Sequence, residues 1–213
     1  MKKILLFILA VFVGLGFQSV FAIPTLELSD GVPENTVTIT DGLAGDSNPT
    51  SGVVTFIGAV GVFDINVSTG LTTIPYLDLN SVNVNTTGGG TLTIKFGDTG
   101  FSATEPGFST KVGGTAGGTA SFETWMGSSL FDEGTLLGSL GVFGPGAFSG
   151  SVDSYPVSIP ASFSLTGIAT LTHRGPGQSS FDLELTPVPE PGTLLLLGSG
   201  LIGAAFYARR RKK

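Results

Sequence analysis

Apolar and polar residues alternate along the middle of the chain, from Thr36 to Leu185. Successive side chains of a β-strand point to opposite faces, so a period of two predicts strands with one buried face. Helical periodicity is almost absent from this region. The alternation is carried by Val37 and Ile39, Val54 and Phe56, Phe63, Ile65 and Val67, Leu92, Ile94 and Phe96, Phe163, Leu165 and Leu171, and Phe181, Leu183 and Leu185.

Clusters of Gly, Pro, Asn and Asp separate these runs and are typical of tight turns. Short strands at near-regular spacing predict an all-β domain, and we expect an antiparallel β-sandwich of about nine or ten strands. The alternation slips by one residue at Asn80-Ser81, which predicts a β-bulge or two short strands. The glycine-rich segment 110–119 predicts a mobile loop.

The first residues have the pattern of a secretory signal peptide. Lys2 and Lys3 precede an apolar run over residues 4–16, and the small Ala22 stands where cleavage is expected. We therefore expect residues 1–22 to be removed during export across the inner membrane by the secretion machinery. An uncleaved N-terminal anchor is the alternative, although the run is short for a bilayer span of about 20 residues.

A second apolar stretch, residues 193–208, contains no charged residue and predicts a single transmembrane helix. Basic residues remain on the cytoplasmic side of a membrane, so the basic cluster after this stretch predicts a cytoplasmic C-terminus and an exported middle domain, residues 23–187. The cluster consists of Arg209, Arg210, Arg211, Lys212 and Lys213.

The segment 188–192 before this helix contains Pro189, Glu190 and Pro191. A Pro-Glu-Pro motif, an apolar helix and an Arg-rich end, in this order, resemble the sorting tag of PEP-CTERM proteins, here residues 188–213. The resemblance implies processing near Pro189 by a membrane-embedded exosortase. It further implies transient anchoring in the membrane, then a place at the cell surface or in an extracellular matrix, with exopolysaccharide as a partner. A plain anchor with a proline-rich hinge is the alternative.

Charge and cysteine content narrow the function of the exported domain. The whole chain carries a formal charge of −6, but residues 23–187 hold three basic and fifteen acidic residues, a net charge of −12. Such a surface repels phosphate backbones, so nucleic acid is not an expected partner. The chain has no cysteine, which excludes disulfides, thiol catalysis and cysteine-based metal sites.

Two weaker patterns point to ligand binding. Acidic and amide side chains in turn-rich loops are suitable calcium ligands, with Asp41 and Asp46 as the main candidates, although Asp and Asn also favour turns for backbone reasons. No EF-hand loop motif is present, so no metal or other cofactor is expected beyond this calcium alternative. Trp125, the only tryptophan, could stack on a sugar as part of an aromatic platform or pack in the core. The platform would combine it with Phe122, Tyr76, Tyr155 and Phe148.

No catalytic residue is predicted. His173 is the only histidine, which is too few for a zinc site, and we expect it to be solvated or structurally hydrogen-bonded. Asp132-Glu133, Asp78 and Glu123 could be proposed as glycosidase carboxylates, but nothing in the sequence sets a pair across a cleft. We therefore expect a non-enzymatic surface or matrix protein. A glycan- or calcium-binding surface module is the alternative, and a secreted hydrolase is the third.

Overall fold

The computed structural model describes residues 23–68, 75–102, 107–155, 157–188 and 199–202. The expected signal peptide, the residues Pro189, Glu190 and Pro191, and the basic cluster lie outside this part of the chain. The expected transmembrane segment is covered only at residues 199–202. Within the described residues, no helix has the length and apolar character needed to cross a membrane.

The domain that begins at Ile23 is built almost entirely of β-strands. A short 3-10 helix, η1 (Pro33–Asn35), is inserted between the first two strands. The strands are β1 (Thr25–Ser29), β2 (Val37–Thr40), β3 (Thr55–Val60), β4 (Phe63–Ser68), β5 (Leu77–Thr86), β6 (Gly90–Phe101), β7 (Gly107–Ala116), β8 (Thr119–Gly127), β9 (Thr135–Phe143), β10 (Gly146–Ser154), β11 (Phe163–His173) and β12 (Gly177–Val188).

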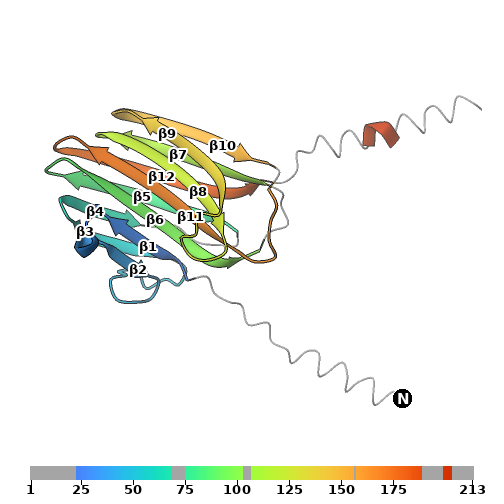
Figure 1. The fold of residues 1–213 in the computed structure, drawn as a ribbon, viewed down its shortest axis with the longest axis horizontal. Coiled ribbons are helices and arrows are strands. Elements are labelled where there is room, and N and C mark those ends of the chain that lie inside the picture. Colours follow the sequence, from blue (N-terminus) through green and yellow to red (C-terminus); the bar gives the residue numbers. More distant parts are fainter. Residues whose placement is uncertain (1–22, 69–74, 103–106, 156, 189–198, 203–213) are drawn as a thin grey trace, which may run out of the picture.

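The strands form two six-stranded sheets, and neighbouring strands in each sheet are antiparallel. Sheet A has the order β2-β1-β6-β11-β8-β9, and sheet B has the order β10-β7-β12-β5-β4-β3. The strands of both sheets run in similar directions, with β9 and β10 at one side and β2 and β3 at the other (Figure 1). This arrangement confirms the predicted antiparallel sandwich.

The space between the sheets is filled by the apolar residues that alternate along the strands, as predicted. Phenylalanine rings dominate the side where β9 and β10 meet. The ring of Phe122 lies edge to face with that of Phe181, with centroids 5.0 Å apart, and tilted against that of Phe148 at 5.5 Å. The largest fully buried aromatic side chains are Phe63, Phe96, Phe101, Phe108, Phe122, Phe163 and Phe181.

The phase slip at Asn80-Ser81 is a β-bulge, which confirms the first of the two predicted explanations. The pairing of β5 with β12 shifts there, so that Asn80 and Ser81 oppose the single residue Asp182. Ser81 has a positive φ of 52°, and its N–H donates to Oδ1 of Asp182 over 2.6 Å. The carboxylate thus satisfies a backbone donor that the bulge removes from the ladder.

The prediction of a mobile loop over residues 110–119 is wrong. This segment is the larger part of β7 together with the turn into β8. A side chain at Gly114 would collide with the backbone of β12 at Ser180 and Phe181, and one at Gly118 would collide with Thr172. The absence of a side chain therefore serves the close approach of two strands, a role that composition alone does not distinguish from flexibility.

The described residues contain more strands than the nine or ten predicted. The additional strands escaped the pattern because small and polar residues occupy many of their positions. In β10, no residue is fully buried, since this strand lies at an edge of sheet B. Alternation of large apolar residues marks a strand only where the strand covers a core.

Candidate functional site

Sheet B carries a group of polar side chains, four carboxamides and one carboxylate, on its outer face. Asp64 and Asn66 point outward from β4, and Asn83 and Asn85 point outward from β5, while their apolar neighbours along each strand face the core. Gln178 joins them from β12. Alternation along three neighbouring strands therefore brings five polar side chains to one surface.

Strand register places these side chains in two transverse rows. Asp64 pairs with Asn85, and Asn85 pairs with Gln178, so the first row crosses β4, β5 and β12. Asn66 pairs with Asn83 in the second row. Directly opposed residues of neighbouring strands have Cβ atoms about 4.5–5.5 Å apart, so the rows present polar groups at short, regular intervals.

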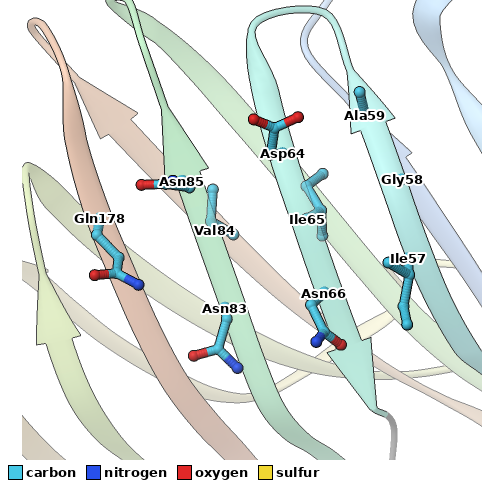
Figure 2. A pocket seen from close by; sticks show the side chains of 10 residues that line it. All are labelled: Ile57, Gly58, Ala59, Asp64, Ile65, Asn66, Asn83, Val84, Asn85 and Gln178. Carbon is cyan, nitrogen blue, oxygen red and sulfur yellow. The ribbon is translucent and has the colours of Figure 1, made fainter.

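The rows line a shallow depression with a volume of about 470 Å³, which we call the amide trough (Figure 2). Its apolar wall is the edge strand β3, where the side chain of Ile57 is 69% exposed. Figure 2 shows the carboxamides of Asn66 and Asn83 beside each other on adjacent strands. The residues that define the amide trough are Ile57, Asp64, Asn66, Asn83, Asn85 and Gln178.

Most carboxamides of the amide trough are not used by the fold. Nδ2 of Asn83 donates to the carbonyl of Ser81 over 3.2 Å. The carboxamides of Asn66, Asn85 and Gln178 make no hydrogen bond with another described residue. Each offers two donors and one acceptor oxygen, the complement of a hydroxyl group, which both donates and accepts. These carboxamides can therefore bind the hydroxyl groups of a neutral ligand without placing a charge of their own against it.

Trp125 lies on the other sheet. Its side chain projects from the outer face of β8 and is half-buried, and its indole Nε1 donates to Oε2 of Glu123 over 3.3 Å. Phe122 and Phe148 point into the core, where they contact each other. The aromatic platform suggested by the sequence is therefore not assembled, although Trp125 itself is accessible at its own surface.

His173 is buried, with 2% of its surface exposed, at the end of β11. Its Nε2 shares a hydrogen bond of 3.0 Å with Oγ of Ser179, which also accepts the backbone N–H of Gly117. Burial lowers the pKa of His173 below its usual range. Of the two states expected for this histidine, solvated or structurally hydrogen-bonded, the second is confirmed.

The acids considered for hydrolysis take structural roles. The carboxylate of Asp132 accepts both the N–H and the hydroxyl of Ser128, and these bonds lower its pKa. Glu133 forms an ion pair with Lys95, with Nζ and Oε1 3.1 Å apart. These two neighbouring acids therefore have separate partners, Ser128 for Asp132 and Lys95 for Glu133.

Asp78 has the most unusual carboxylate environment of these acids. It stands opposite Glu184 on the outer face of sheet B, and burial, together with the charge of Glu184, raises its pKa. Burial and the charges of Asp78 and Glu184 raise the pKa of Tyr76 to about 12. The phenol of Tyr76 donates a hydrogen bond to Asp78, and this bond acts to lower the pKa of Asp78 against the effect of burial.

The calcium candidates Asp41 and Asp46 lie in one loop between β2 and β3. Oδ2 of Asp41 accepts the N–H of Gly52 over 2.7 Å. Both oxygens of Asp46 accept backbone N–H groups, which is turn chemistry. The described residues contain no group of three or more His, Cys, Asp or Glu that could hold a metal ion.

Sequence reasoning missed the carboxamides of the amide trough. The signal was present as Asn66 after Asp64 and as Asn83 and Asn85, polar residues two apart on strands whose other face is apolar. Their convergence depends on which strands are neighbours and in what register. Alternation alone predicts neither the neighbours of a strand nor its register, because every half-buried strand alternates in the same way.

The comparisons with known proteins concern the end of the chain and the fold. The sequence profile of the PEP-CTERM protein-sorting motif matches residues 187–212, which include the Pro-Glu-Pro tripeptide, the apolar stretch and most of the basic cluster. The chain carries a PEP-CTERM sorting motif. This confirms the resemblance expected from the sequence.

A PEP-CTERM motif is the recognition tag of an exosortase-type processing enzyme, so the chain is a sorted, exported protein of the cell surface or extracellular space. The match begins at Pro187, inside β12, and the Pro-Glu-Pro residues follow directly after Val188, where this strand ends. The sorting motif is therefore joined to sheet B without an intervening linker in the sequence.

No curated protein matches the chain. Among solved structures, one similar chain is the enzymatically active domain of bacteriophage CBA120 tailspike protein 4, with a TM-score of 0.38 and 7% identity over 62% of this chain and 20% of that one. Another is TmCBM61 in complex with β-1,4-galactotriose, with a TM-score of 0.34 and 6% identity over 62% of this chain and 92% of that one.

Proposed function

We propose that the chain is a non-enzymatic surface protein that, after exosortase processing near Pro189, associates with a neutral extracellular polysaccharide through its amide trough. The observation that carries this proposal is the convergence of Asn66, Asn83, Asn85 and Gln178 on one accessible surface. The sorting motif supports the location, because a PEP-CTERM protein is delivered outside the cell.

The chemistry of the amide trough favours a neutral glycan. Carboxamides hydrogen-bond hydroxyls without charge, and the exposed aliphatic side chain of Ile57 can cover the apolar C–H face of a sugar ring. Polar rows that repeat from strand to strand match a polymer whose hydroxyl groups recur along its length. An anionic polymer would meet Asp64 within the trough and the charge of −12 carried by residues 23–187.

A role without catalysis is supported by the state of the acids and of the histidine. Asp132 and Glu133 hold a loop, and His173 is buried against Ser179. These contacts engage Asp132, Glu133 and His173 within the fold, which favours a binding role over hydrolysis.

The test uses the exported protein, isolated from cells that secrete and process it. Binding of neutral polysaccharides such as dextran, a β-glucan and a galactan is measured by isothermal titration calorimetry, with anionic alginate for comparison. The triple variant Asn66→Ala/Asn83→Ala/Asn85→Ala should lose affinity for the polysaccharide that binds by about tenfold or more, because three hydrogen bonds contribute about 0.5–1.5 kcal/mol each.

Asn80→Ala is the control. Asn80 is an exposed carboxamide on β5, like Asn83 and Asn85, but it lies outside the amide trough. This variant should bind like the unsubstituted protein. Trp125→Ala tests the surface on sheet A separately. Loss of binding in Trp125→Ala but not in the triple variant would move the site to the tryptophan, and no binding of any neutral polysaccharide would contradict the glycan proposal.

A further inference from the structure

The N-terminal end of the described domain lies against a buried carboxylate. The backbone nitrogen of Ile23 donates to Oδ1 of Asp98 over 3.1 Å. Asp98 belongs to β6, and only 1% of its surface is exposed. The same oxygen accepts the N–H of Thr99 over 2.6 Å.

The backbone at Ile23 is held in place by the residues that follow it. Pro24 is buried, and its carbonyl accepts the N–H of Asp41 over 3.0 Å. The hydroxyls of Thr25 and Thr40 are 3.3 Å apart, and β1 begins at Thr25. The nitrogen of Ile23 is therefore fixed beside Asp98, while its side chain, which is 59% exposed, contributes little to this placement.

Removal of the signal peptide changes the chemistry of this nitrogen. In the precursor it is a peptide amide, with one N–H and no charge. Hydrolysis of the bond between Ala22 and Ile23 consumes one water, leaves a carboxylate on Ala22 and gives Ile23 an amine, which takes up a proton near neutral pH. The resulting ammonium carries a full charge and three donors.

A buried carboxylate is stabilised far more by an ammonium than by an amide. A desolvated charge costs several kcal/mol unless an opposite charge and hydrogen bonds compensate it. The amide of the precursor already donates a charge-assisted hydrogen bond to the carboxylate, so cleavage adds the opposite charge itself and two further donors. The position of Asp98 is therefore better suited to the mature N-terminus than to the uncleaved chain.

We propose that Asp98 is the binding site for the α-ammonium group of Ile23, and that removal of the signal peptide creates a buried ion pair that ties the mature N-terminus to β6. This inference rests on the expected removal of residues 1–22 during export, and it goes beyond the proposed function by linking that cleavage to the stability of the exported domain. It also requires that the mature chain begin at Ile23, because a start one residue earlier would move the charge away from the carboxylate.

The experiment compares mature proteins that differ in this pair. The full chain is exported from cells and purified in detergent, and N-terminal sequencing establishes its first residue. In one variant a single glycine is inserted between Ala22 and Ile23, so that the amide at Ile23 is restored and only the charge is displaced. The second variant is Asp98→Asn, the third combines both changes, and Asp153→Asn, an exposed acid on β10, is the control.

Each single change at the pair should lower the midpoint of thermal unfolding by roughly 6 °C or more, and the combined variant should lose clearly less than the sum. Asp153→Asn should leave the midpoint unchanged. If Asp98→Asn does not fold, selective acetylation of the α-amine of the unsubstituted protein gives the same test of the charge.

An unchanged midpoint after glycine insertion or acetylation, in a protein that begins at Ile23, would overturn the ion pair and leave the proposed function standing. Additive losses in the combined variant would also overturn it. A protein that retains its first 22 residues would overturn the inference and leave the proposed function standing, because a chain with an uncleaved N-terminal anchor is also exported.

Discussion

At the residue scale, single carboxylates organise the loops of this sandwich. Asp46 is the clearest case: Oδ1 accepts the N–H groups of Asn48 and Thr55 over 2.9 and 3.0 Å, and Oδ2 accepts that of Gly42 over 3.0 Å. Burial acts to raise the pKa of Asp46, but the three donors outweigh it and lower the pKa below its usual range.

Asp46→Ala should lower the free energy of unfolding by about 1–3 kcal/mol, because three backbone donors lose their acceptor. Chemical denaturation at neutral pH measures this change. The pKa is lower in the folded state, so the contribution of Asp46 is present above the unfolded pKa of about 4 and is lost as the pH falls through the folded value.

Unfolding measurements also test whether the loop between β2 and β3 binds calcium. With Asp46 acting only as a turn acceptor, addition of calcium or of a chelator should leave the unfolding midpoint of the unsubstituted protein unchanged. A rise with calcium that disappears in Asp46→Ala would identify the loop between β2 and β3 as a cation site instead.

His173 provides the second prediction at this scale. Its folded pKa is lowered by burial, whereas in the unfolded chain the pKa is about 6.5. As the pH falls below about 6.5, the unfolded chain binds a proton that the folded protein excludes, so the free energy of unfolding decreases until the pH passes below the folded pKa.

Thermal unfolding between pH 5 and 8 measures this slope. Because His173 is the only histidine, His173→Gln should remove most of the slope below pH 6.5. If the stability of the unsubstituted protein is constant over this range, the prediction is wrong, because folding then does not lower the pKa of His173.

At the scale of elements, glycine sets how closely strands approach. In β7, Gly114 lies so near Ser180 and Phe181 of β12 that a Cβ atom would overlap them, whereas a Cβ atom on Gly113 would meet nothing within 4 Å. These adjacent residues offer a matched pair for a substitution experiment.

Gly114→Ala should lower the free energy of unfolding by about 1–3 kcal/mol, as expected for overpacking. Gly113→Ala should be neutral or stabilise the domain slightly, because it restricts the unfolded chain without a clash. Equal effects of the two substitutions in urea denaturation would mean that the glycines serve only flexibility, as the sequence first suggested.

The elements also show what the sequence can predict. Alternation located the strands that bury large apolar residues, such as β4, β6 and β12, and the phase slip located the bulge at Ser81. It could not separate a glycine-rich strand from a loop, because close packing and flexibility use the same residue. Nor could it place Asn66 beside Asn83, since lateral order and register are properties of the folded sheet.

At the scale of the whole molecule, processing is expected at both ends of one folded unit. Ile23 follows the expected signal peptide and contacts Asp98, and Val188 ends β12 directly before the Pro-Glu-Pro residues. The sandwich thus fills the sequence between the two expected cleavage sites, so that processing would release a complete domain.

The most direct test of this account is the intact mass of the protein recovered from its native host, compared with that of a Glu190→Ala variant. The account predicts that the unsubstituted protein, found outside the cytoplasm, has lost both its first 22 residues and the segment beyond the Pro-Glu-Pro motif, and that the variant retains this C-terminal segment in the membrane. Full-length C-terminal segments in both proteins would contradict it and would identify a permanent membrane anchor.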